Sequence, residues 1–149
     1  GLRTLDKYAV VTGGGQNHRY GLSDAVLIKD NHISAAGGIR NAISIIRNKI
    51  PHTVKIEVET ESFEQVEEAV AAKADIIMLD NMSFDVMREA VRITAGREPL
   101  EDSGGISRET IRKVAKTGVD LISVGAVTHS VKALDISMDI GEMKRFLTV

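Results

Sequence analysis

Cysteine is absent from the 149-residue chain, which excludes a disulfide framework, a thiolate nucleophile and a zinc or iron–sulfur site with cysteine ligands. No stretch approaches the roughly 18 apolar residues that a membrane-spanning helix needs. The first residues also lack the basic region and apolar run of a secretion signal. The charges nearly balance, with 19 Lys and Arg against 21 Asp and Glu, so the composition gives no general attraction for nucleic acid or an anionic membrane. We therefore expect a cytoplasmic protein that binds neither nucleic acid nor membranes.

Short aliphatic or β-branched runs recur along the chain and predict strands. Apolar positions with helical spacing lie between them, as in the segment 62–70. This alternation predicts an α/β fold of parallel strands, either a barrel or an open doubly wound sheet, and no GxGxxG motif favours the second. Because five or six strand–helix units fall short of the eight in a closed barrel, we expect an incomplete or open (β/α) barrel, TIM-barrel-like, in one domain spanning 1–149. The predicted strands are 25–28, 54–59, 76–79, 99–101 and 121–124.

Serine residues mark the expected starts of three helices. Ser62 with Gln65 forms a capping-box pattern, and Ser83 and Ser107 resemble further N-caps. Gly118 is expected to end the helix that starts at Ser107.

Two carboxylates, Glu59 and Asp80, end neighbouring predicted strands. In α/β folds the carboxyl ends of the strands form the functional edge, so both side chains are expected on one rim. Their oxygens suit Mg²⁺, bound directly or through water. Glu57 shares a strand face with Glu59 one layer deeper. Ordinary ion pairing is the alternative for all three.

Glycine-rich loops follow the last two predicted strands and favour a phosphate site. Ser103 and Gly104 lie in the first loop and Gly125 in the second. Glycine lets the backbone approach a phosphate closely, and serine adds a hydroxyl donor. The alternative is a pair of tight turns. His32 and His129 are candidate neighbours of a phosphate or metal, although no histidine pair has zinc-site spacing.

Basic side chains gather around a glycine-rich N-terminal loop. His18, Arg19 and Lys29 would form a compact cationic pocket suited to a dicarboxylate. A solvated basic loop is the other interpretation.

Six segments, taken together and in order, resemble quinolinate phosphoribosyltransferase, a family of decarboxylating enzymes of NAD biosynthesis. The resemblance runs from residue 1 to residue 136. It implies reaction of quinolinate with phosphoribosyl pyrophosphate, dependent on Mg²⁺, to give nicotinate mononucleotide, pyrophosphate and CO₂. The segments are 13–19, 27–32, 56–59, 79–82, 103–106 and 124–130.

The resemblance also implies roles for individual residues. Lys29, Glu59 and Asp80 match catalytic positions, the two acids serving the ribose hydroxyls and Mg²⁺. The remaining matches hold the quinolinate carboxylates or the 5′-phosphate. They are His18 and Arg19 for quinolinate, beside Lys29, and Ser103, Gly104 and Gly125, with His129 close by, for phosphate.

The chain departs from the family at its start and at one loop. Members carry an N-terminal α/β domain and a first barrel strand before the Gly-Leu-Arg that this sequence has at 1–3, so we expect the C-terminal barrel part alone, with an incomplete quinolinate pocket. In the family a partner subunit completes the site, so a homo-oligomer, a dimer or larger, is expected of the complete protein. Asp102 replaces a small or apolar residue and is expected beside the phosphate loop.

Two other functions fit parts of the pattern. An inactive fragment could act only as a phosphate-binding or oligomerisation module, with Glu59 and Asp80 kept as ion pairs. A paralogue associated with molybdate transport shares the barrel, but the Lys-Asp-Asn-His at 29–32 resembles the quinolinate enzyme more closely.

Overall fold

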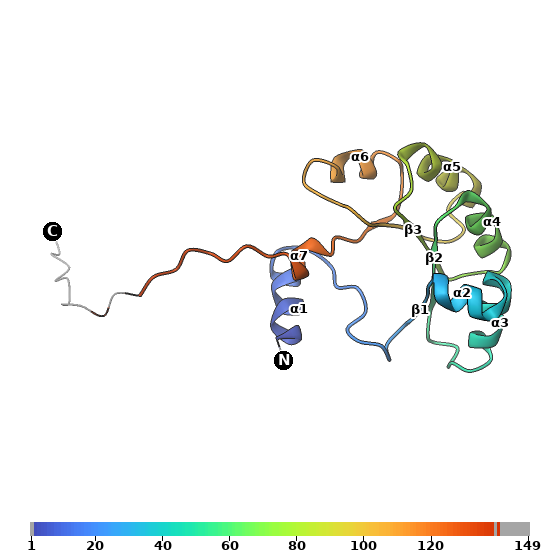
Figure 1. Cartoon of the computed structure of the whole chain (residues 1–149), viewed down its shortest axis with the longest axis horizontal. Coiled ribbons are helices and arrows are strands. Elements are labelled where there is room, and N and C mark those ends of the chain that lie inside the picture. Colours follow the sequence, from blue (N-terminus) through green and yellow to red (C-terminus); the bar gives the residue numbers. More distant parts are fainter. Residues whose placement is uncertain (1, 139, 141–149) are drawn as a thin grey trace.

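The computed structural model describes residues 2–138 and 140. Residues 1, 139 and 141–149, which the single-domain prediction includes, lie outside the described residues. The described chain alternates strands and helices after one N-terminal helix (Figure 1). The elements are α1 (Arg3–Thr12), β1 (Val26–Ile28), α2 (Asp30–Ala36), α3 (Ile39–Arg47), β2 (Ile56–Thr60), α4 (Phe63–Ala71), β3 (Ile76–Asp80), α5 (Phe84–Thr94), β4 (Leu100–Ser103), α6 (Ile111–Ala115), β5 (Leu121–Ile122) and α7 (Ala126–His129).

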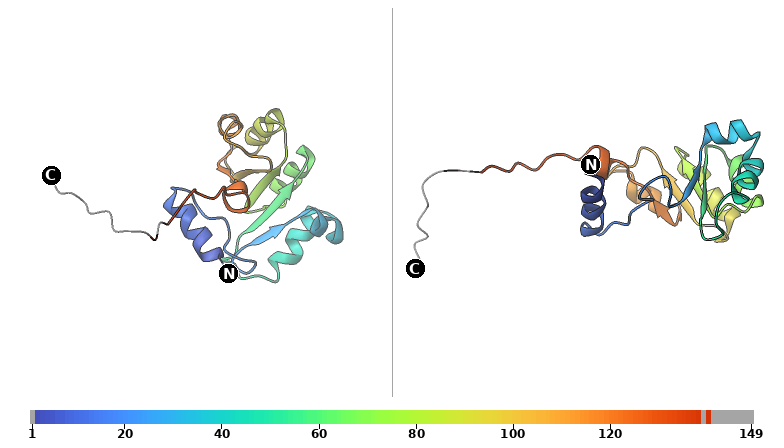
Figure 2. Two further views of the ribbon diagram at one scale, coloured as in Figure 1. Left: turned by 60° about the vertical axis from the view of Figure 1, so that its left-hand side comes forward. Right: turned by 90° about the horizontal axis from the view of Figure 1, so that it is seen from below.

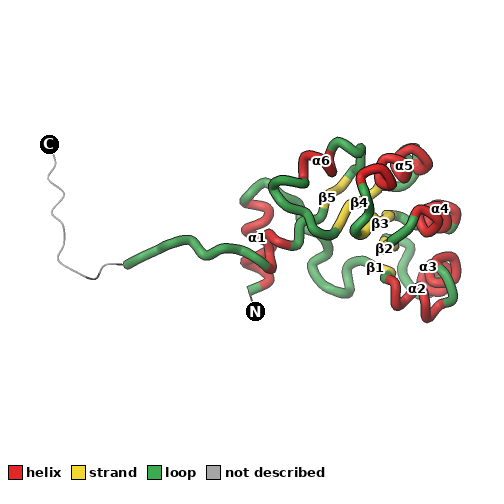
Figure 3. The backbone as a smooth tube through the Cα atoms, turned by 45° about the horizontal axis from the view of Figure 1, so that its top comes forward, coloured by secondary structure: helices red, strands yellow, loops and turns green. Residues whose placement is uncertain are grey.

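The strands form one parallel sheet whose spatial order, β1-β2-β3-β4-β5, follows the sequence. Helices α2 to α6 lie along one side of this curved sheet, whereas α1 and α7 lie on the other (Figure 1, Figure 3). Among the described residues β1 and β5 do not pair with each other, so the sheet is open. The predicted open (β/α) barrel is confirmed.

Alternation along each strand gives the sheet two faces with different chemistry. Side chains in register point to the same face, so Val58, Ile77 and Leu100 share one side. All three are almost completely buried, and they pack with apolar residues of the covering helices such as Ile39 and Val66. Burial of this face holds the helices on the sheet. The other face carries the polar side chains and opens toward α1 and α7.

Two of the three predicted helix caps are confirmed. Ser62 Oγ accepts from the Gln65 amide at 3.3 Å, and Ser83 caps α5 in the same way. Gln65 Oε1 reaches back to the amide of Glu61, one residue before the cap, at 2.7 Å. Ser107 instead caps a turn, because its Oγ accepts from the amide of Thr110 and α6 begins only after that turn.

The N-terminal helix α1 was not among the expected elements. Its apolar side chains are exposed, with Leu5 at 62% and Tyr8 at 70%, so helical spacing there reflects no packing against the core. The loop 13–25 that follows is tied back to the helix by Lys7, whose Nζ donates to the carbonyls of His18 and Arg19. This tie fixes where the loop crosses the open face of the sheet.

The end of the described chain extends away from the domain. Residues 131–138 have neither helix nor strand and lead away from α7 (Figure 2). No helix among the described residues is long and apolar enough to cross a membrane.

Candidate active site

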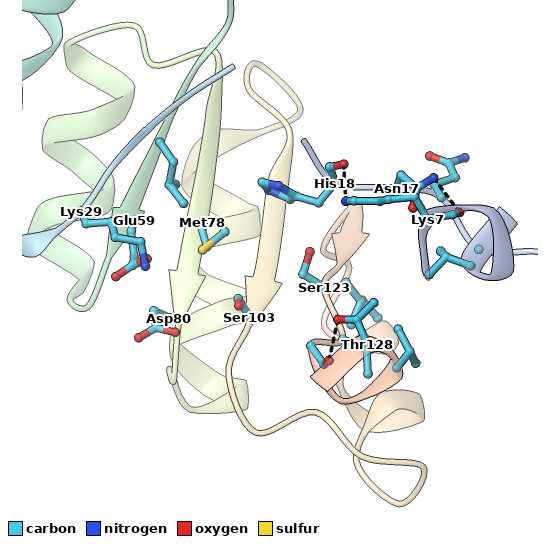
Figure 4. A pocket seen from close by; sticks show the side chains of 18 residues that line it. Lys7, Asn17, His18, Lys29, Glu59, Met78, Asp80, Ser103, Ser123 and Thr128 are labelled. Atoms are coloured by element: carbon cyan, nitrogen blue, oxygen red, sulfur yellow. Dashed lines mark hydrogen bonds and ion pairs between the residues drawn. The ribbon is translucent and has the colours of Figure 1, made fainter. Parts of the chain in front are cut away.

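The register of the sheet places three predicted site residues on one rim. Glu59 pairs with Met78 across β2 and β3, and Asp80 pairs with Ser103 across β3 and β4. Side chains in register share a face, so these polar groups stand together at the carboxyl ends of the strands (Figure 4). They line a cavity of about 580 Å³ between the sheet, the loop after α1, and α7.

Lys29 enters this rim as an ion pair. It is the first residue after β1, and its Nζ lies 3.2 Å from Glu59 Oε2. Its backbone amide donates to His32 Nδ1 at 3.0 Å. His32 therefore serves the start of α2 and does not line the cavity.

Asp80 keeps more of its carboxylate available than Glu59 does. Its Oδ2 accepts from Asn81 Nδ2 at 3.0 Å, and no ion pair involves it among the described residues. Asn81 has a left-handed backbone conformation, and its backbone N–H donates to the Ser103 carbonyl at 3.1 Å. The turn after β3 is thus tied to the end of β4, which fixes Asp80 relative to Ser103.

The two glycine-rich loops reach the cavity in different ways. Ser103, Gly125 and Thr128 line it, whereas Gly104 and His129 do not. Gly104 has a φ of +95°, and a Cβ there would lie 2.3 Å from Asn81 Oδ1. The positive φ favours glycine, and any larger residue there would displace the Asn81 side chain. A Cβ on Gly125 would meet the His129 ring at 3.0 Å, so His129 packs directly behind the second loop.

A buried cluster lies one layer nearer the amino ends of the strands. His18 Nε2 is 3.0 Å from Glu57 Oε2 and 3.6 Å from Glu101 Oε1. The hydrogen bond to Glu57 raises the pKa of the His18 imidazole, and burial raises the pKa of the Glu101 carboxyl. Ser123 Oγ donates to Glu101 Oε1. Glu57 lies one layer deeper than Glu59, as its spacing predicts, with a histidine as its partner.

The structure does not gather His18, Arg19 and Lys29 into one cationic pocket. Lys29 is neutralised by Glu59 and His18 is paired with Glu57. Arg19 lies beside a second, smaller cavity of about 470 Å³ and not beside the first. Consecutive side chains of a loop point in different directions. The sequence does not show which side chain of the loop 13–25 faces the sheet.

Asp102 lies on the opposite face from the phosphate loop. It pairs in register with Leu79, whose side chain is in the core, and its own side chain is completely buried. Within the part of the chain that the structure describes, neither carboxylate oxygen of Asp102 has a hydrogen-bond partner. Burial, and secondarily the charge of Asp80, raise the pKa of Asp102 to about 6. The expectation that it adds a carboxylate beside the phosphate loop is wrong, because strand alternation turns Asp102 away from Ser103.

Sequence reasoning missed three residues at this face. Lys7 and Asn17 line the cavity from α1 and its loop, and Ser123 binds Glu101. Ser123 directly follows β5, so the rule used for the other strand ends could have found it. Lys7 gave no such signal because α1 was not predicted.

Comparison with known proteins places this chain in a family. The family model described as "Quinolinate phosphoribosyl transferase, C-terminal domain" matches residues 1–139. A Bacillus subtilis protein named as a probable carboxylating nicotinate-nucleotide pyrophosphorylase is 52% identical over 94% of this chain and 48% of its own length. A Nicotiana tabacum mitochondrial quinolinate phosphoribosyltransferase is 47% identical over 94% of this chain and 45% of its own length. The chain thus spans about half the length of these relatives.

Solved structures agree with this placement. The nicotinate-nucleotide pyrophosphorylase from Francisella tularensis matches with a TM-score of 0.87 and 51% identity over 91% of this chain and 48% of that one. A thiamine phosphate pyrophosphorylase from Pyrococcus furiosus, 20% identical with a TM-score of 0.53 over 83% of this chain and 65% of that one, shares the fold alone. The chain belongs to the family of quinolinate phosphoribosyltransferase C-terminal domains.

Proposed function

We propose that this chain supplies the phosphoribosyl-pyrophosphate half of a quinolinate phosphoribosyltransferase site. The complete reaction transfers the phosphoribosyl group to quinolinate with loss of pyrophosphate and CO₂. One observation carries the proposal: a single cavity is lined by the carboxylates of Glu59 and Asp80 together with Ser103 and Gly125. A sugar phosphate needs both kinds of group: carboxylates that accept hydrogen bonds from its hydroxyls, and N–H or O–H groups that donate hydrogen bonds to its phosphate oxygens.

The two kinds of group in the cavity suit different parts of phosphoribosyl pyrophosphate. Carboxylates accept hydrogen bonds from sugar hydroxyls, so Glu59 and Asp80 are proposed to orient the ribose. Ser103 Oγ and the amide of Gly125 are proposed to bind the 5′-phosphate, with Gly104 shaping the loop and His129 supporting it from behind. With the ribose held in this way, both acids would lie near the positive charge that develops on it as pyrophosphate departs, and fixed negative charge would stabilise that charge.

The carboxylate oxygens at the rim of the sheet are ligands that fit Mg²⁺. Glu59 and Asp80 line the same cavity and offer oxygen ligands, which this ion prefers. When bound with the donor, Mg²⁺ would neutralise the diphosphate leaving group. Lys29, already 3.2 Å from Glu59, is proposed to hold that carboxylate in place and to face the incoming quinolinate.

Quinolinate binding by this chain is expected to be weaker than donor binding. Among the described residues, three basic side chains that line the cavity each have a partner: Lys7 on two carbonyls, His18 on Glu57 and Lys29 on Glu59. A dicarboxylate must compete with those partners, and Arg19 lies elsewhere. His18 and Arg19 remain proposed quinolinate ligands. A cytoplasmic location and a homo-oligomer stay predictions from the sequence.

Calorimetric titration with phosphoribosyl pyrophosphate, with and without Mg²⁺, tests the proposal. We expect Asp80→Asn to weaken Mg²⁺-dependent binding at least about tenfold, because the loss of one charge-assisted contact costs roughly 1.5–3 kcal/mol. The matched control is Asp85→Asn, an exposed acid paired only with Arg88 on α5, which should leave binding unchanged. Equal affinity of Asp80→Asn and the parent chain would refute the assigned role. Binding that ignores both Mg²⁺ and Asp80 would indicate a simple phosphate-binding module.

A further inference from the structure

Three side chains with metal-binding atoms converge in the layer behind the proposed donor site. His18 comes from the loop after α1, Glu57 from β2 and Glu101 from β4. Their ligand atoms all lie within 4.8 Å of one another. Neither carboxylate lines the larger cavity, and the proposed function uses neither.

The cluster brings two buried carboxylates to a single imidazole. Glu57 is 5% exposed and Glu101 is 4% exposed, and both face the same imidazole. That imidazole can contribute at most one positive charge. When both carboxylates are ionised, one negative charge is left without a partner, and a cation beside the smaller cavity that both line would compensate it.

A second observation, independent of the clustering, concerns the far oxygen of Glu57. Its Oε2 is bonded to His18, but Oε1 is sealed from solvent and has no hydrogen-bond partner among the described residues. Buried carboxylate oxygens are normally satisfied by donors or by a metal ion. The orphaned atom therefore points to a missing cationic ligand at this position.

We propose that His18, Glu57 and Glu101 bind a divalent first-row transition cation such as Mn²⁺, Co²⁺ or Zn²⁺. One imidazole nitrogen with two carboxylate oxygens suits these ions, whereas Mg²⁺ and Ca²⁺ prefer oxygen ligands alone. This site is separate from the Glu59 and Asp80 rim and takes a different class of ion. Three protein ligands leave coordination positions open to solvent or to an anion.

The surrounding contacts hold the ligands ready. Ser123 Oγ donates to Glu101 and fixes the orientation of that carboxylate. Lys7 Nζ donates to the His18 carbonyl at 3.0 Å and to the Arg19 carbonyl at 2.9 Å, which anchors the loop that carries the imidazole. Hydrogen bonds of this kind orient metal ligands. His18 also borders both cavities, so an ion has a path to the site.

Titration of the full chain with Co²⁺, followed by visible absorption, tests the site without any activity assay. We expect one strong cobalt site whose spectrum shows nitrogen and oxygen ligation. His18→Gln and Glu57→Gln should each weaken it by more than about tenfold, since even changing the partners of metal ligands costs that much. The matched control is His52→Gln, an exposed histidine in the segment before β2, which should bind cobalt like the parent chain.

Two further comparisons separate this site from the proposed donor site. Asp80→Asn should leave the cobalt spectrum intact although it weakens Mg²⁺-dependent donor binding, so either proposal can fail alone. Circular dichroism checks that each variant folds, and Glu101→Gln gives the same test if Glu57→Gln does not fold. Absence of a cobalt spectrum in the parent chain, or an unchanged spectrum in His18→Gln, would overturn the inference.

Discussion

At the scale of single residues, Asp102 is the clearest departure from what its strand favours. Its neighbours in register and along the strand, Leu79 and Leu100, belong to the apolar core. Asp102 shares their face and leaves two carboxylate oxygens unbonded. Desolvation of the charged form is the main reason that the pKa of its carboxyl rises to about 6.

The shifted pKa predicts how stability depends on pH. Between about pH 4 and 6 the folded chain holds a proton on Asp102 that the unfolded chain has lost, so the free energy of unfolding falls as pH rises through this range. A shift from 3.8 to about 6 corresponds to about 3 kcal/mol of lost stability, fully expressed above pH 6.

Asp102→Asn should remove this dependence. We expect the variant to have a higher free energy of unfolding than the parent chain at pH 7.5, by about 1–3 kcal/mol, and a similar one near pH 4. Urea unfolding in the presence of a chelator, repeated across this pH range, measures the difference. Asp85→Asn, with its exposed side chain, is the control and should parallel the parent chain. A constant difference between Asp102→Asn and parent at every pH would show that Asp102 does not titrate as described.

Residue roles were only partly predictable from the sequence. The shared rim of Glu59 and Asp80 follows from strand alternation and parallel pairing, and the structure places both on one cavity. Strand alternation and pairing do not predict which basic side chain forms an ion pair with which acid. Which acid meets Lys29 or His18 depends on register across strands and on the path of a loop.

At the scale of elements, the turn after β4 depends on glycine for two separate reasons. Gly104 and Gly105 both have positive φ, at +95° and +61°. Only Gly104 is also crowded, since a Cβ there would overlap the Asn81 side chain, whereas nothing lies within 4 Å of a Cβ on Gly105. Substitutions at the two glycines therefore distinguish the cost of a positive φ, which both share, from the cost of the contact with Asn81, which only Gly104 has.

Substitution of each glycine by alanine should give unequal effects. Gly105→Ala is expected to cost about 1–2 kcal/mol, the usual penalty of an L-residue in the left-handed region. Gly104→Ala should cost at least about 1 kcal/mol more, and it should weaken donor binding because Asn81 moves the Asp80 turn. Thermal unfolding and calorimetric titration of both variants check this. Equal destabilisation by the two substitutions would mean that the Asn81 contact is unimportant.

Element boundaries were predicted best where apolar runs become buried. The five predicted strands all exist, because each aliphatic run forms part of the core face or the cavity face. β5 is shorter than its run, ending at Ile122 although the Ser123 amide still bonds the Asp102 carbonyl. α1 was missed because its apolar residues face solvent, and α6 starts late because Ser107 and Thr110 first form a turn.

At the scale of the whole molecule, the two faces of the open parallel sheet have different roles: one packs against helices, and the other carries the proposed site. Helices α2 to α6 cover one face of the sheet (Figure 3), and this face carries almost all of the core. The opposite face carries the cavity with Glu59 and Asp80 (Figure 4) and the cluster of His18, Glu57 and Glu101. The order of strand–helix units was enough to predict this architecture. The loop after α1 was not, although it brings Lys7 and His18 over the sheet and closes one side of the cavity.

Phosphoribosyl pyrophosphate is proposed to bind with both its ribose and its 5′-phosphate in one cavity. A crystal structure of the chain soaked with phosphoribosyl pyrophosphate and Mg²⁺ tests it most directly. We predict the 5′-phosphate within about 3 Å of Ser103 Oγ and the Gly125 amide, a normal hydrogen-bond distance, and the ribose hydroxyls on Glu59 and Asp80. A donor bound with its phosphate away from Ser103 and Gly125, or an empty cavity at saturating donor, would contradict the account.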